Sequence, residues 1–61
     1  MKLTAKSKDG AYKQLQAMYI EQGNSGNYVL ADKLHNLAQD VLFDDYLTIA
    51  NIRHRFNKIV K

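Results

Sequence analysis

Cysteine and proline are both absent from this 61-residue chain, and so are long hydrophobic runs. Without cysteine, no disulfide can form and no metal can be held by thiolates. With tyrosine left out, the longest uninterrupted apolar runs, at 29–31 and 41–43, have three residues, far fewer than the ~20 that cross a bilayer. The first lysines are not followed by an apolar stretch, so we expect no secretory signal. The sequence therefore predicts a cytoplasmic protein with no membrane partner.

A chain this short cannot gain much stability from its own core. It forms at most one domain, and such a domain buries only about 60% of the surface that its unfolded chain exposes. An apolar fraction of 46% with 10% aromatic residues is nevertheless too rich for a disordered chain. Because disulfides are excluded, association with a second subunit is the remaining aid to stability. We therefore expect a homo-oligomer.

Two of the three glycines, Gly23 and Gly26, mark one internal break in the chain. Before it, apolar residues at helical spacing predict a helix over residues 10–22. Ser7 or Asp9 could cap its first amides, and Gly23 would end it in the left-handed conformation. The stripe consists of Ala11, Leu15, Met18 and Gln22.

The strongest pattern follows the break and predicts a central helix over residues 27–43, capped by Ser25 or Asn27. Its inward seam consists of Leu30, Leu34, Leu37 and Val41, and a second line along its flank consists of Ala31, Ala38 and Leu42. A helix that is apolar over so wide an arc usually has neighbours on two sides.

A third helical pattern opens at Asp44 and Asp45, where acids suit a helix N-terminus. Its stripe consists of Ile49, Ile52, Phe56 and Ile59. The junction has no glycine or proline, so either a tight turn or a kink in one long helix could join it to the second helix. The predicted fold is all-α: a small three-helix bundle over residues 9–61, a helical hairpin plus a C-terminal helix, with a mobile basic arm at residues 1–8.

The predicted hairpin resembles a tetratricopeptide repeat over about residues 11–38. The matching positions are Ala11, Tyr12, Leu15, Tyr19 and Gly23 in the first helix, and Ala31 and Ala38 in the second. Gln16 replaces a small residue of the repeat, and the loop is about three residues longer than the repeat's. The resemblance implies a helical hairpin, and no binding residues are transferred from it.

Candidate catalytic groups are few. His35 and His54 are the only histidines, and they lack the spacing of metal ligands. A capping role explains Asp44 and Asp45, and the loop at 23–27 lacks the Lys-Ser/Thr pair of a phosphate-binding loop. We therefore expect no enzymatic activity, no cofactor, no metal and no small-molecule substrate.

The charges are sorted by position, because all six acids lie between two basic ends at residues 1–8 and 53–61. Such segregation suits binding to a charged partner or to another copy of the chain. Four apolar residues fall off the helical stripes and could form a protein interface: Ile20, Val29, Phe43 and Leu47.

The sequence thus predicts a protein–protein interaction module, a regulator or adaptor that self-associates. The alternative is an accessory protein that binds nucleic acid through the basic arm and the third helix. Its candidate contacts are Lys2, Lys6, Lys8, Arg55, Lys58 and Lys61.

Overall fold

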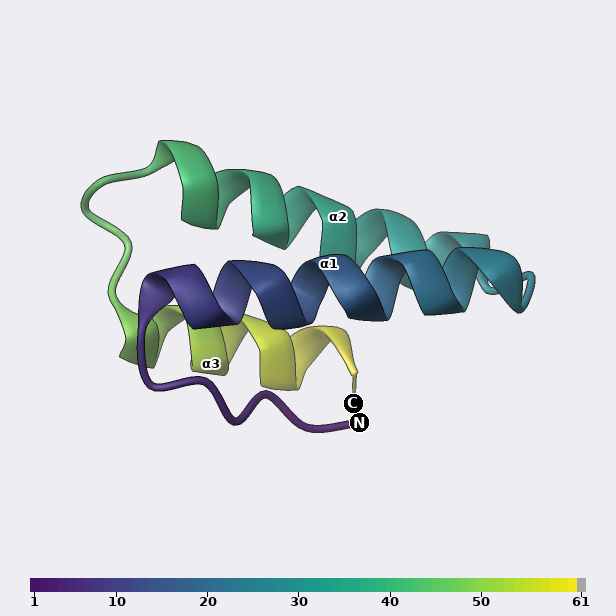
Figure 1. Cartoon of the computed structure of the whole chain (residues 1–61), viewed down its shortest axis with the longest axis horizontal. Helices are drawn as coiled ribbons and strands as arrows, with labels where there is room; N and C mark the ends of the chain where they lie inside the picture. Colours follow the sequence, from purple (N-terminus) through teal and green to yellow (C-terminus); the bar gives the residue numbers. More distant parts are fainter. Residues whose placement is uncertain (61) are drawn as a thin grey trace.

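The computed structural model describes residues 1–60 and contains three α-helices within them: α1 (Lys8–Asn24), α2 (Tyr28–Phe43) and α3 (Ile49–Ile59). α1 and α2 form an antiparallel hairpin, and α3 runs back beneath them in the direction of α1 (Figure 1). The described residues contain no strand, so the predicted all-α three-helix bundle is confirmed. None of these helices combines the length and the apolar character needed to cross a membrane.

Hydroxyl caps begin α1 and α3. The Ser7 Oγ accepts a hydrogen bond from the Gly10 amide at 3.2 Å, and the Thr48 Oγ1 accepts one from the Asn51 amide at the same distance. Of the two caps offered by the sequence for α1, the structure thus uses Ser7. At the start of α2 the side chain of Asn27 makes no cap bond. It donates instead to the Gln22 Oε1 at 2.8 Å.

The turn between α1 and α2 corrects the expected role of Gly23. α1 continues through Gly23 to Asn24, and the residue in the left-handed region is Gly26, with a φ of 86°. Backbone bonds from the Ser25 amide to the Glu21 carbonyl and from the Asn27 amide to the Gln22 carbonyl close the turn. Gly26 suits this position because a glycine adopts positive φ without a Cβ clash.

The core is built entirely from apolar side chains, and among the described residues no polar or charged side chain is buried. α2 contacts both α1 and α3, as its wide apolar arc predicts. The predicted inward seam is buried at Leu34, Leu37 and Val41 and half-buried at Leu30. The core consists of Ala11, Leu15, Leu34, Leu37, Ala38, Val41, Leu47, Ile52 and Phe56.

Residues 44–48 form a separate linker, so α2 and α3 are two helices and not one kinked helix. Asp44 and Asp45 lie in this linker instead of opening α3, because Thr48 supplies the cap. The Asp44 Oδ1 accepts from the Tyr46 amide at 3.0 Å, and its carbonyl accepts from the Leu47 amide at 3.2 Å. The Lys8 Nζ also donates to that carbonyl, at 2.8 Å. These bonds tie the linker to the start of α1.

The N-terminal segment, residues 1–7, has contacts that a mobile arm would lack. Leu3 and Ala5 pack against the core. The Gln14 Oε1 accepts from the amides of Thr4 and Ala5, at 3.0 and 2.8 Å, and its Nε2 donates to the Thr4 Oγ1 at 2.8 Å. Arg53 donates to the Ala5 carbonyl at 3.0 Å. The structure thus places this segment against α1 and α3, and the mobility of the arm stays a prediction. The last residue of the predicted arm, Lys8, belongs to α1.

Candidate interaction site

Large apolar side chains are exposed at both ends of α2. Three of the four predicted interface residues are among the exposed ones: Ile20 is 51% exposed, Val29 73% and Phe43 74%. Leu47 is only 9% exposed and belongs to the core. Its assignment to an interface is corrected, because Leu47 packs into the core. The apolar flank line predicted for α2 is also wrong at Leu42, which is 52% exposed. Two further exposed residues to which the sequence did not point are Tyr28 and Tyr46.

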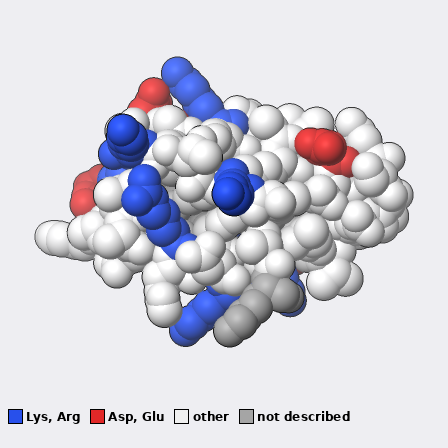
Figure 2. Space-filling view, turned by 90° about the horizontal axis from the view of Figure 1, so that it is seen from below, with Lys and Arg blue, Asp and Glu red and all other residues white. Residues whose placement is uncertain are grey.

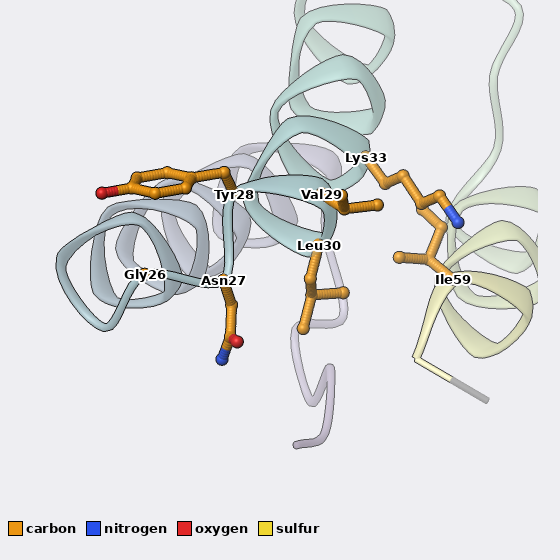
Figure 3. Close-up of a pocket in the computed structure, with 7 residues that line it drawn as sticks. All are labelled: Gly26, Asn27, Tyr28, Val29, Leu30, Lys33 and Ile59. Atoms are coloured by element: carbon orange, nitrogen blue, oxygen red, sulfur yellow. The ribbon is translucent and has the colours of Figure 1, made fainter.

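A hollow of about 460 Å³ lies between the start of α2 and the end of α3. Val29 and Ile59 point into this space from opposite sides, with Lys33 close by, whereas Tyr28 extends away from it over the end of α1 (Figure 3). The hollow exists because α3 has 11 residues and α2 has 16. α3 therefore leaves the first turn of α2 uncovered. The lining residues are Gly26, Asn27, Tyr28, Val29, Leu30, Lys33 and Ile59.

A second hollow of about 330 Å³ continues along α2 and α3 and shares Lys33 and Ile59 with the first. Its other lining residues are Asn36, Arg55 and Lys58. We call the two hollows together the α2–α3 groove. None of its lining residues is acidic, and both Lys33 and Lys58 are exposed. The groove is therefore apolar where Val29, Leu30 and Ile59 line it and basic at its rim, where Lys33 and Lys58 are exposed.

The opposite end of α2 carries the reverse charge. Residues 42–46, which we call the acidic turn, present Leu42, Phe43 and Tyr46 beside Asp44 and Asp45, and all five are exposed. Tyr46 is 92% exposed. Within residues 1–60 neither of the two carboxylates forms an ion pair. This end of α2 is thus an apolar projection with two unpaired negative charges.

The predicted nucleic-acid contacts do not form one strip. Arg55 points toward α2, where its Nη2 lies 2.8 Å from the Asp40 carboxylate, and Lys58 lines the groove beside it. Lys8 is held by the Asp44 carbonyl. Lys2 and Lys6 are exposed on the N-terminal segment, and Lys61 lies outside the described residues. Seen from the side of α3, Lys and Arg side chains are spread over the surface with uncharged atoms between most of them (Figure 2).

Arg53 is a basic contact that the sequence did not single out. Its guanidinium donates a hydrogen bond to the carbonyl of Ala5, the residue before Lys6, and so joins α3 to the N-terminal segment. Helical spacing alone could not show this, because residues 1–7 have no periodicity. Arg53 thus contacts the N-terminal segment, which carries the exposed Lys2 and Lys6, whereas Arg55 and Lys58 line the groove.

His35 has a structural place between α1 and α2. Its ring meets the ring of Tyr19 edge to face, with centroids 4.9 Å apart, and its Nε2 lies 3.3 Å from the Gln39 Nε2. His54 is exposed on α3. Among residues 1–60 no three His, Cys, Asp or Glu side chains gather closely enough to hold a metal ion.

No family model matches the chain, and the comparisons with curated proteins and with solved structures likewise give no match. The resemblance to a tetratricopeptide repeat therefore rests on the helical hairpin alone. The exposed surfaces of the molecule have to supply the functional argument.

Proposed function

We propose that this protein is a small non-enzymatic interaction module, a regulator or adaptor, and that the α2–α3 groove is its docking site for another protein. The observation that carries the proposal is the open apolar hollow with Val29 left 73% exposed at its edge. Scattered single apolar residues are normal on protein surfaces. Apolar residues that line a concavity and are rimmed by polar groups mark interaction sites.

The energetics favour a protein partner over a small ligand. Burying one Val, Leu or Ile side chain contributes about 1.5–3 kcal/mol. Val29, Leu30 and Ile59 offer three such side chains, each already partly exposed. The hollow is open along the groove and lacks the convergent polar groups that orient small ligands. A partner that inserts an apolar anchor and covers the rim would gain most from this surface.

Capture from native extract tests the proposal when it is done with paired variants. The wild-type protein and two variants, Val29→Glu and Ala17→Glu, are immobilised, and each extract is divided into nuclease-treated and untreated halves. Ala17 is the matched control because it is an exposed apolar residue on α1 outside the groove. We expect a nuclease-resistant protein partner that the wild type and Ala17→Glu retain and that Val29→Glu loses. Equal retention by both variants would contradict the groove as docking site.

A second candidate function is nucleic-acid binding, and the observation that favours it is the bond between Arg53 and Ala5. This bond joins Arg53 of α3 to the N-terminal segment, on which Lys2 and Lys6 are exposed. Retention on heparin or duplex DNA measures it, because each phosphate contact lowers log K by about 0.9 per unit of log salt. Binding weakened by Lys6→Glu with Arg53→Glu, but not by Arg55→Glu with Lys58→Glu, would support this group. The variant with Arg55→Glu and Lys58→Glu is a suitable control because Arg55 is already paired with Asp40.

A further inference from the structure

We infer that the partner that fills the α2–α3 groove is a second copy of this chain, which inserts its acidic turn, residues 42–46, in a head-to-tail arrangement. The inference rests on the proposed function, since it names the occupant of the same docking site. Four features of the structure carry it: complementary charge, complementary shape, the hydrogen bonds that order the acidic turn, and the positions of the two surfaces on the molecule.

The charges of the two surfaces are opposite. No acid lines the groove, and its rim exposes Lys33 and Lys58. The acidic turn carries the exposed carboxylates of Asp44 and Asp45, which form no ion pair within the described residues. Opposite potentials steer two surfaces together and set their register. The overall charge of +3 opposes association between copies, so this local complementarity is what an approaching copy would use.

The shapes of the two surfaces are also opposite, one hollow and one projecting. Phe43 and Tyr46 are 74% and 92% exposed, and an aromatic side chain buries roughly 150–250 Å² when it is fully covered. The hollow of about 460 Å³ has room for one such ring against Val29, Leu30 and Ile59. Phe43 is the better anchor because its ring has no hydroxyl that would need a partner.

The acidic turn is already ordered, so docking it costs little conformational entropy. The Asp44 side chain accepts from the Tyr46 amide, and the Lys8 Nζ donates to the Asp44 carbonyl. Leu47, the residue that follows the turn, is packed in the core. A segment held in one conformation before it binds gives a tighter complex than a flexible one.

The positions of the two surfaces decide the symmetry. Val29 and Phe43 are separated by 14 residues of α2, about 21 Å at ~1.5 Å per residue. A molecule therefore cannot fill its own groove, and it can use both surfaces at once. Such a heterologous contact propagates into a ring or an open chain of subunits. A two-fold groove-to-groove dimer would bring the basic rims of two copies together, Lys33 and Lys58 of one copy facing those of the other, which like-charge repulsion disfavours.

Mixing two blocked variants tests this arrangement. Val29→Glu blocks the groove, and Phe43→Glu removes the anchor of the acidic turn and adds a third acid to it. Ala17→Glu, at an exposed residue of α1 outside both surfaces, is the matched control. Circular dichroism checks that all three variants keep the helix content of the wild type. Sedimentation velocity and light scattering then measure mass against protein concentration, up to about 1 mM.

We expect the wild type and Ala17→Glu to grow in mass with concentration, and each blocked variant to associate at least ten-fold more weakly, a change of about 1.4 kcal/mol. An equimolar mixture of the two blocked variants should form a dimer and nothing larger, because one intact groove meets one intact turn. Raising the salt concentration should weaken the dimer, since salt screens exposed charges.

Three results would overturn the inference: a wild type that stays monomeric, a blocked variant that associates as the wild type does, or a mixture that stays monomeric. A monomeric wild type that still captures a protein partner through Val29 would end the self-association and leave the proposed function standing. A monomeric wild type that also captures no partner through Val29 would contradict the inference and the proposed function together.

Discussion

The middle of α2 and its two ends use similar apolar side chains in opposite ways. Leu34 and Leu37, in the middle, are fully buried, whereas Val29 and Phe43, at the ends, are about three-quarters exposed. The difference comes from coverage and not from side-chain chemistry. α1 and α3 flank the middle of the helix, while the hairpin turn and the linker leave its ends open (Figure 1). The comparison teaches that stability and association should be separable along a single helix.

The largest expected effect separates the middle of α2 from its end. Leu37→Ala should lower the free energy of unfolding by about 2–5 kcal/mol, because it removes buried methyl groups and leaves a cavity. Phe43→Ala should change it by no more than about 0.5 kcal/mol, as is usual for exposed sites. Urea unfolding followed by circular dichroism measures both. Comparable losses in the two variants would show that the end of α2 is part of the folded core.

The two glycines of the hairpin turn should respond with opposite sign. Gly26 has a φ of 86°. Gly26→Ala should destabilise the protein by about 1–2 kcal/mol, because at positive φ the new Cβ lies too close to the adjoining backbone carbonyl. Gly23→Ala should stabilise it by about 0.5–1 kcal/mol, since alanine favours a helix more than glycine does. Nothing lies within 4 Å of a Cβ built at either glycine. The thermal midpoints of the two variants check this. A lower midpoint for Gly23→Ala than for Gly26→Ala would mean that Gly23, as the sequence predicts, is the residue in the left-handed conformation.

Gln14 tests whether the N-terminal segment is docked. Gln14→Ala removes three hydrogen bonds to Thr4 and Ala5 and should cost about 1 kcal/mol, because two of the three form at an exposed site. Gln16→Ala is the matched control, from the same helix and residue type. Amide hydrogen exchange at Ala5 measures the docking directly. Exchange at the rate of an unfolded chain in the wild type would restore the mobile arm that the sequence predicts.

The smallest effect concerns the ion pair between Asp40 and Arg55, which joins α2 to α3. Its side chains are 51% and 41% exposed, so a double-mutant cycle with Asp40→Asn and Arg55→Gln should give a coupling of only about 0.2–1 kcal/mol. The coupling should fall further in high salt. A value of several kcal/mol would mean that α3 is held to α2 by charge more than by Ile52 and Phe56.

Helical spacing predicted the three helices and most of the core because periodicity reports directly on which face of a helix is covered. It could not choose between Gly23 and Gly26, since both lie in the same polar stretch and spacing carries no information on φ. Leu47 was misplaced for a related reason. It lies in the linker, where the angle that a helix would give its side chain does not apply.

The contacts of residues 1–7 were beyond sequence reasoning because they are made over long separations in the chain. Gln14 and Arg53 reach the segment from two different helices, and no local pattern in residues 1–7 signals either one. The pairing of Arg55 with Asp40 was missed in the same way. Of the basic face predicted for the third helix, Arg55 and Lys58 both line the α2–α3 groove, and Lys61 lies outside the described residues.

The absence of buried polar side chains within residues 1–60 has a consequence for how this sequence can change over generations. A dry interior without hydrogen bonds to preserve accepts exchanges among Leu, Ile and Met that keep its volume, at a cost below about 1.5 kcal/mol. Exposed positions change at a still lower cost, within about 0.5 kcal/mol. An aromatic ring kept at position 43 in diverged descendants of this chain would therefore have to be explained by a use of that exposed ring and not by the stability of the fold.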